Sequence, residues 1–114
     1  MTNVARGHQA EAVAADYLRK HGYKIVAINW RRPRAEIDII ATAKHQPLVF
    51  VEVKYRQQSH QGSGLDYITT RKLAQMQFAA ELWVQENRHR GEYALAVIEL
   101  TGPNFTVSQF VPQL

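Results

Sequence analysis

Two neighbouring stretches of the chain carry acidic side chains within patterns that otherwise describe buried β-strands. Ala35–Thr42 has the sequence Ala-Glu-Ile-Asp-Ile-Ile-Ala-Thr, and after a short polar break Leu48–Arg56 has Leu-Val-Phe-Val-Glu-Val-Lys-Tyr-Arg. Both stretches alternate with the period of two that is typical of a strand. A buried sheet rarely accepts unpaired carboxylates, so this hairpin constrains both the fold and the chemistry of the chain.

Strand alternation sorts the side chains of the first stretch between two faces of the sheet. Glu36, Asp38 and Ile40 are expected on one face, and Ile37 and Ile39 on the other. In the second stretch the same alternation places Glu52, Lys54 and Phe50 together, opposite the valines at 49, 51 and 53.

A turn centred on His45 would fix the register of the hairpin. In that register Asp38 faces Glu52, and Glu36 faces Lys54. Two ionised carboxylates ~4 Å apart repel by ~4 kcal/mol at an effective dielectric of about 20. A divalent cation would offset that repulsion, and oxygen ligands in a chain without cysteine favour Mg²⁺ or Mn²⁺.

Two interpretations of these charged residues remain open at this point. In the first, Asp38 and Glu52 hold the cation, and Lys54 orients or activates a water and stabilises charge on a phosphoryl oxygen. In the second, the four charged side chains form a satisfied ion network on a solvated face, as cross-strand pairs of opposite charge commonly do.

Further elements are expected on both sides of the hairpin. The patterns predict helices over Thr2–His21 and Thr69–Arg88 and strands over Tyr23–Arg31, Tyr93–Leu100 and Phe105–Val111. A helix between two strands favours a right-handed crossover, which would lay Tyr93–Leu100 parallel to Leu48–Arg56, with the last strand at an edge. The sequence therefore predicts an α/β fold with a central mixed five-stranded sheet flanked by helices.

The first predicted helix has a carboxylate in the middle of its apolar stripe. The stripe consists of Val4, Gly7, Glu11, Ala14, Ala15 and Leu18, and Gly22 is placed to end the helix. Either Glu11 reaches water at the edge of a shallow stripe, or it points into a polar site on the sheet.

The second predicted helix carries a more uniform stripe. It consists of Leu73, Met76, Ala80, Trp83 and Val84, with Lys72 at its N-terminal margin. The polar stretch Gln57–Leu65, which contains two glycines, predicts a loop before this helix. That loop is either a segment that closes on substrate or an ordinary linker.

Composition limits the class of protein. A chain of 114 residues, of which 46% are hydrophobic, suits one domain spanning residues 1–114. The absence of cysteine, of a signal-peptide pattern and of a long apolar run suggests a cytoplasmic protein without a membrane segment. A net charge of +4 and a pI near 9.6 suggest an anionic partner, most commonly nucleic acid.

The hairpin resembles a known active site. Glu-Ile-Asp-Ile-Ile, a short gap, and Leu-Val-Phe-Val-Glu-Val-Lys are similar to the active-site hairpin of the PD-(D/E)XK nuclease superfamily. Within it, most of the chain resembles the small bacterial YraN family, also called UPF0102. The matching residues outside the hairpin are Gly7, Glu11, Tyr17, Leu18, Gly22, Tyr23, Asn29–Arg32, Thr70, Lys72, Ala79 and Ala80.

That resemblance implies the restriction-endonuclease-like αβββαβ core, which is also the element order predicted from the patterns. It implies that Asp38 and Glu52 are metal ligands and that Lys54 is the catalytic lysine. Archaeal Holliday-junction resolvases similarly place a helix glutamate beside the hairpin, which gives Glu11 the role of a further ligand that completes the site, with Glu36 in support. Ala35 departs from the family, which usually has glycine there, and Tyr93-Ala94 lacks an acid that many relatives carry.

Six basic residues lie near the ends of the strands and the helix that bracket the hairpin. Clustered around an acidic centre, they would hold a phosphate backbone, although each alone is an ordinary surface charge. They are Arg31, Arg32, Arg34, Arg56, Arg71 and Lys72. Arg88 and Arg90 are interpreted as a separate cluster at a helix C-terminus, and the five histidines lack zinc-site spacing.

The leading hypothesis is a nuclease dependent on Mg²⁺ or Mn²⁺ that hydrolyses phosphodiester bonds, with branched or single-stranded DNA as the favoured substrate. By analogy with resolvases it would act as a homodimer. One alternative is a non-catalytic DNA-binding module of a larger recombination or repair assembly. A second is a protein-interaction domain in which the basic excess serves only solubility.

Overall fold

A computed structural model describes residues 3–57 and 65–114. Within these residues the chain forms two helices and five strands: α1 Asn3–Lys20, β1 Lys24–Arg32, β2 Ala35–Thr42, β3 Leu48–Arg56, α2 Thr70–Glu86, β4 Tyr93–Thr101 and β5 Thr106–Val111. The α/β prediction is confirmed, and β2 and β3 have the predicted bounds. Most of the predicted loop Gln57–Leu65 lies outside the described residues.

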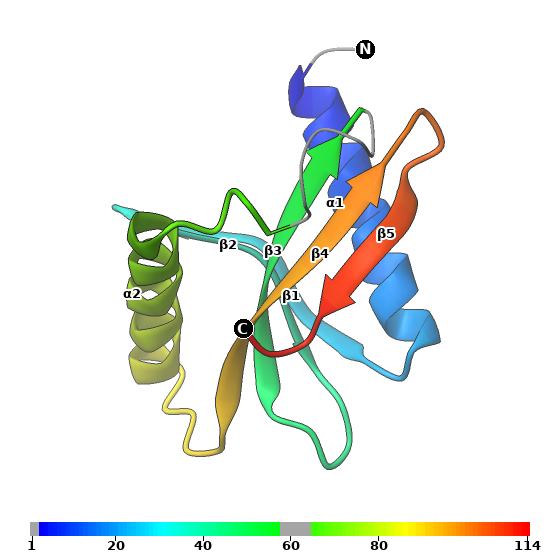
Figure 1. Ribbon diagram of the computed structural model, residues 1–114. Coiled ribbons are helices and arrows are strands. Elements are labelled where there is room, and N and C mark those ends of the chain that lie inside the picture. The colour runs from blue at the N-terminus through cyan, green and yellow to red at the C-terminus, as the bar shows by residue number, and fades with distance from the viewer. Residues whose placement is uncertain (1–2, 58–64) are drawn as a thin grey trace.

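The strands form one mixed sheet in the order β1-β2-β3-β4-β5 (Figure 1). Neighbouring strands are antiparallel except β3 and β4, which are parallel, so the predicted parallel pairing of these two strands is confirmed. β5 lies at an edge, as predicted. α1 covers one face of this sheet, and α2 covers part of the other, chiefly over β2 (Figure 1).

α1 packs through its small residues and ends where predicted. Ala14, Ala15 and Leu18 are buried against the sheet, whereas Val4 is 68% exposed, because close packing begins only at Ala10. At the C-terminal end Gly22 takes a φ of 90°, and the backbone N–H groups of the two residues after His21 donate to carbonyls of the last turn. This cap turns the chain directly into β1.

α2 packs through Met76, Ala79, Ala80 and Trp83. The predicted stripe is wrong at Leu73, which is 39% exposed. The helix lies mainly over β2, so Leu73 faces an open groove beside β4 instead of the core.

A local change of face at Asp38 overturns part of the predicted alternation in β2. Ile37 packs with Ile40 on the α2 side, whereas Ile39 packs on the α1 side, so the prediction that Ile37 and Ile39 share a face is wrong. Opposite this point in β1, Asn29 has a left-handed φ of 57°. Such a backbone irregularity resets the alternation of the strands beside it.

The predicted register of the β2–β3 hairpin is confirmed for the pairs Ile39–Val51, Ile40–Phe50 and Ala41–Val49. Regular pairing ends there, so the predicted partners Asp38–Glu52 and Glu36–Lys54 do not form pairs. Glu36 instead lies opposite Arg31 of β1, where their side chains form an exposed ion pair of 3.4 Å. The two strands of the hairpin therefore separate at the acidic residues.

Across the described residues, neither helix is long and apolar enough to span a membrane.

Candidate active site

Asp38 occupies the point where β2 and β3 separate. Its Oδ2 accepts a hydrogen bond of 2.8 Å from the backbone N–H of Val53, so a side chain takes the place of a strand carbonyl. Burial raises the pKa of Asp38 to about 8, with further increases from the charges of Glu52, Glu11 and Glu36, while the Val53 hydrogen bond acts in the opposite direction. Asp38 is thus a partly buried carboxyl group with other acids around it.

Glu52 lies on the α2 side of the sheet, as alternation in β3 predicts. Its Oε2 is 3.0 Å from Nζ of Lys72, and its side chain is mostly buried. Lys72 is held in the first turn of α2, where its backbone N–H donates to the hydroxyl of the capping residue Thr69 at 3.1 Å. The helix cap therefore positions the cation that balances Glu52.

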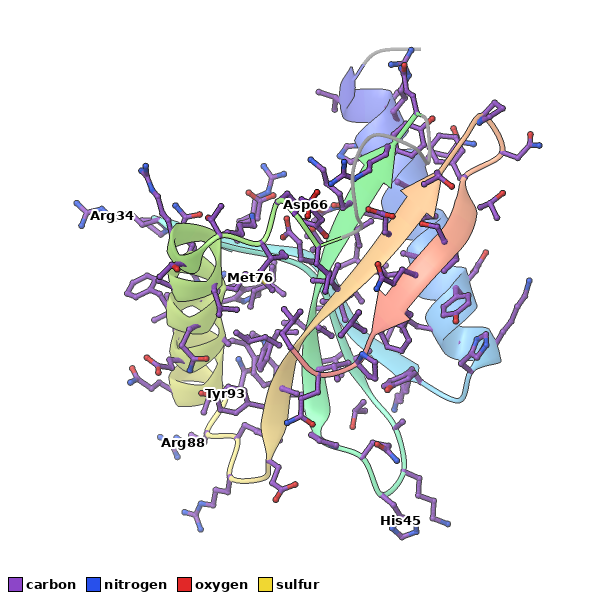
Figure 2. All side chains as sticks on the ribbon, in the orientation of Figure 1. Arg34, His45, Asp66, Met76, Arg88 and Tyr93 are labelled. Carbon is purple, nitrogen blue, oxygen red and sulfur yellow. The ribbon has the colours of Figure 1, made fainter. Side chains whose placement is uncertain are left out.

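A small hollow of about 10 Å³ separates the two acids and is lined by Asp38, Glu52, Phe50 and Met76 among others. That volume is about what one water molecule needs. Figure 2 shows Met76 extending from α2 toward the sheet beside this region. The hollow offers oxygen donors of the kind that Mg²⁺ and Mn²⁺ prefer.

Glu11 reaches this centre from the other face of the sheet. Its Oε1 is buried and has no hydrogen-bond partner, and its charge contributes to the raised pKa of Asp38. An unpaired buried carboxylate oxygen is costly, so this geometry favours the second interpretation of Glu11, in which it points into a polar site. Among the described residues no three acidic or histidine side chains already gather around one point closely enough to hold a metal ion.

Lys54 lies two residues after Glu52 in β3, so the two side chains are on the same face of the sheet. Its Nζ is 5.2 Å from the ring centre of Tyr67, a residue just before α2. The hydroxyl of Tyr67 is buried without a partner, and burial raises the pKa of that phenol, with Glu52 and Glu99 contributing in the same direction. Tyr67 therefore adds an unused hydrogen-bond donor to the site.

Glu99 of β4, like Tyr67, was not among the site residues predicted from the sequence. It is 6% exposed and lies beside Lys54 in the parallel register. Its carboxylate accepts hydrogen bonds of 2.9 Å from Arg56 Nε and from Ser108 Oγ. A lone acid in the apolar run Tyr93–Leu100 was the available signal, since it matches the pattern that identified the hairpin.

Arg56, one of the predicted DNA-binding cations, is mostly buried and has an acidic partner. Its side chain is only 13% exposed, is paired with Glu99 and lies with its guanidinium 5.6 Å from the ring centre of Tyr67. Such a paired, mostly buried cation is better placed to stabilise the site than to contact a phosphate group of bound DNA.

Four of the other predicted cations gather around one basic cavity of about 380 Å³, beside the hollow between the acids. They are Arg31, Arg32, Arg34 and Lys72. The cavity also contains Glu36, and both spaces share Glu36 and Met76 in their walls. Arg34 lies at the tip of the β1–β2 turn, near the N-terminal end of α2 (Figure 2).

Two of these arginines are already paired at the edge of the cavity. Arg31 pairs with Glu36, and Arg32 pairs with Glu86 at 2.9 Å and also lies 4.6 Å from the ring centre of Trp30. Arg71 is exposed in the first turn of α2 and does not line the cavity.

Two other charged or titratable residues, His45 and Arg88, lie away from the basic cavity. His45 lies at the tip of the β2–β3 turn and Arg88 lies beyond the C-terminal end of α2, both away from Arg34 (Figure 2). The interpretation of Arg88 as part of a separate helix-end cluster agrees with this position.

The fold and the site together define an α/β protein whose mixed five-stranded sheet opens between two strands onto a cluster of acids and cations. The sequence profile of the uncharacterised protein family UPF0102 matches residues 10–100, and the chain belongs to this family.

Similar proteins carry the same family name. A UPF0102 protein of Cytophaga hutchinsonii is 32% identical over 107 residues, covering 94% of both chains. A UPF0102 protein of Photobacterium profundum is 34% identical and covers 96% of this chain and 89% of its own length. A third, from Deinococcus radiodurans, is 46% identical over 77 residues, or 68% of this chain and 63% of its own length.

Proposed function

We propose that the protein is a metal-dependent nuclease that hydrolyses phosphodiester bonds in DNA. The observation that carries this proposal is Asp38, a partly buried carboxyl group that lines one small hollow with Glu52 and Glu36 and has an oxygen bonded to the Val53 N–H. Such an arrangement calls for a cation. The resemblance of the hairpin to that of the PD-(D/E)XK nucleases also supports a metal-dependent nuclease.

Asp38 and Glu52 would hold Mg²⁺ or Mn²⁺, with Glu11 contributing its unpaired oxygen. The bound ion would supply Lewis-acid polarisation of a phosphoryl oxygen. The ammonium of Lys54, on the same face of β3 as Glu52, would orient the attacking water and stabilise negative charge that develops on the phosphate. Tyr67 offers a hydrogen-bond donor on the same side of the sheet.

The basic cavity would hold the phosphate backbone next to the scissile bond, through Arg31, Arg32, Arg34 and Lys72. Branched or single-stranded DNA is the favoured substrate, because so small a fold leaves little room for an element that reads duplex sequence. We expect the protein to act in the cytoplasm as a homodimer, the latter by analogy with resolvases.

A second candidate function is a non-catalytic DNA-binding module of a larger recombination or repair assembly. The ion pairs Lys72–Glu52 and Arg56–Glu99 favour it, because they balance part of the acidic charge without a metal ion. Asp38 remains outside these pairs, which is why the enzyme is preferred.

The test is a cleavage assay with Mn²⁺ on a branched and a linear DNA. Wild type is compared with Asp38→Asn and Lys54→Ala, and Lys44→Ala serves as the control because Lys44 is an exposed lysine in the β2–β3 turn. We expect wild type and the control to cut and the two site variants to lose cleavage.

Equal cutting by all four proteins, or cutting by none, would reject the enzyme. DNA binding that persists without cutting would support the non-catalytic module. Weak binding that does not change with salt concentration would support the protein-interaction domain, because phosphate contacts always depend on salt.

A further inference from the structure

Lys72 belongs to two neighbouring sites at once. Its Nζ lies 3.0 Å from Oε2 of Glu52, an acid of the candidate metal site. The same side chain lines the basic cavity of about 380 Å³ together with Arg31, Arg32 and Arg34. Lys72 is also 34% exposed, so its flexible stem has room to change partner.

The pairing with Glu52 conflicts with the binding of a metal ion by that acid. The Lys72 ammonium and a divalent cation would compete for the same carboxylate oxygens, and two cations in a partly buried site repel each other strongly. Lys72 is not needed elsewhere to hold α2, because Thr69 caps the helix through the backbone of Lys72 and not through its ammonium. The side chain is therefore free to leave Glu52 without loss of the cap.

The basic cavity is the place to which Lys72 can move. Arg31 and Arg32 already have acidic partners, Glu36 and Glu86. An additional uncompensated ammonium would make the cavity attractive to an anion, and the oxygens of a phosphate group fit both lysine and arginine donors.

We propose that Lys72 is an exchangeable cation: it neutralises Glu52 while no divalent cation is bound, and it contacts a phosphate group of the nucleic-acid strand in the basic cavity once the metal ion has taken its place. This inference rests on the proposed function. Under this exchange, metal binding and phosphate binding strengthen each other. The metal ion releases Lys72 from Glu52, and the phosphate group holds Lys72 away from Glu52.

The experiment measures the affinity for Mn²⁺ by electron paramagnetic resonance, without DNA, for the full chain and three variants. In Lys72→Met the competitor is gone, so we expect Mn²⁺ to bind about five-fold tighter or more. Arg71→Met is the matched control, because Arg71 is an exposed cation one position away that does not line the cavity. It should change the affinity by less than about two-fold.

A second measurement follows the binding of a fluorescent single-stranded oligonucleotide at several salt concentrations, with and without Ca²⁺. In wild type Ca²⁺ should steepen the dependence of log affinity on log salt by about 0.7, the value for one more phosphate contact on a single strand. In Lys72→Met the steepening should be absent. A metal ion that merely bridges protein and phosphate would steepen both proteins equally.

The outcomes separate this inference from the proposed function. Mn²⁺ affinities of Lys72→Met and Arg71→Met that agree, or an equal change of salt dependence in wild type and Lys72→Met, would overturn the exchange alone. Asp38→Asn, the third variant, should lose Mn²⁺ binding. Unchanged binding in that variant, or no binding by wild type, would overturn the metal site and the exchange with it.

Discussion

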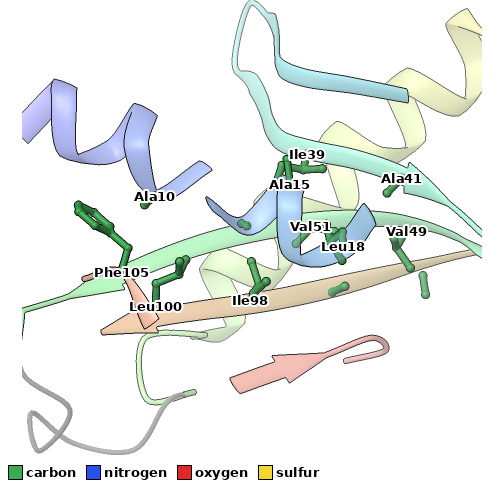
Figure 3. Packing of buried hydrophobic residues seen from close by; sticks show 13 residues of the cluster. Ala10, Ala15, Leu18, Ile39, Ala41, Val49, Val51, Ile98, Leu100 and Phe105 are labelled. Carbon is green, nitrogen blue, oxygen red and sulfur yellow. The ribbon is translucent and has the colours of Figure 1, made fainter. Parts of the chain in front are cut away.

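The two faces of the sheet are built from the same strands but differ in what they bury. On the α1 side, small and branched apolar residues form one continuous cluster that extends from Ala41 and Val49 to Leu100 and Phe105 (Figure 3). On the α2 side, the apolar cluster around Phe50 and Trp83 stops partway along β3, and charged residues take over.

This difference separates the tasks of folding and chemistry. A close-packed apolar face gives stability that depends little on pH or ions. A face with buried acids and cations is costly unless every charge is balanced, so it is maintained for a reason other than stability. The site therefore lies where β2 and β3 separate, supported by the apolar core on the α1 side, from which Glu11 reaches toward it.

The largest expected effect is on the chemistry of the α2 side. Glu52→Gln keeps the shape of the side chain but removes a charge from the proposed metal site, so cleavage should fall by about 10³-fold or more. Circular dichroism should show an intact fold. The control is Glu92→Gln, because Glu92 is an exposed acid just before β4 that lines neither the hollow nor the basic cavity. Equal losses of cleavage in both variants would show that the effect is not specific to the proposed metal site.

The next effect is on the stability of the α1 side. Leu18 is fully buried in the α1-side cluster, so Leu18→Ala should lower the free energy of unfolding by about 3 kcal/mol, measured by denaturant unfolding. Cleavage per folded molecule should stay the same. The comparison is Val4→Ala on the exposed first turns of α1, which should change stability by less than about 0.5 kcal/mol.

A third prediction concerns the cost of the buried acid. Because the pKa of Asp38 is raised to about 8 in the folded protein from 3.8, the folded state keeps a proton that the unfolded state releases. The contribution of Asp38 to stability should therefore be most favourable below about pH 4 and should fall as pH rises toward 8. Asp38→Asn removes that decline, so it should be more stable than wild type by a few kcal/mol at pH 8.5 in EDTA.

The measurement is urea unfolding of both proteins across that pH range. The Val53 N–H keeps an oxygen acceptor in the asparagine variant, so the hydrogen bond is not the variable. A wild type that is no less stable at pH 8.5 than the variant would show that Asp38 is already balanced by a cationic group.

The smallest expected effect concerns the two helix ends. Just after α1 the left-handed position is taken by Gly22, at φ 90°, whereas just after α2 it is taken by Arg88, at φ 52°. Arg88→Gly removes this strain and should raise stability by about 1 kcal/mol, seen as a higher melting temperature. Arg88 is exposed and remote from the site, so cleavage should not change. A loss of stability would mean that the arginine side chain itself holds the helix end.

The hairpin shows how much of this molecule could be predicted from its sequence. The bounds of β2 and β3 and three cross-strand pairs followed from alternation, because apolar periodicity reports burial directly. The reset at Asp38 could not be predicted, because it depends on Asn29 in another strand taking a left-handed conformation. The alternation rule failed at Asp38, where a side-chain oxygen takes the place of a strand carbonyl as the partner of a backbone N–H.

The composition of the site was predicted in part. The acids could be identified because each interrupts an apolar pattern, and Glu99 was overlooked although it does the same. Tyr67 had no such signal, because its burial depends on how the segment before α2 crosses β3 and β4. The pairing of Arg56 with Glu99 could not be predicted, because charge patterns along the chain do not show which cation finds a buried partner.

The most direct test of the central claim is the change in melting temperature when Mn²⁺ is added at pH 8.5. At one hundred times its dissociation constant, an ion that binds only the folded state stabilises by about 2.7 kcal/mol, or roughly 10 °C for a chain of this size. We expect that rise for wild type and for the control Glu92→Gln, and little or none for Asp38→Asn. An equal rise in all three proteins, or none in wild type, would contradict a cation site between β2 and β3.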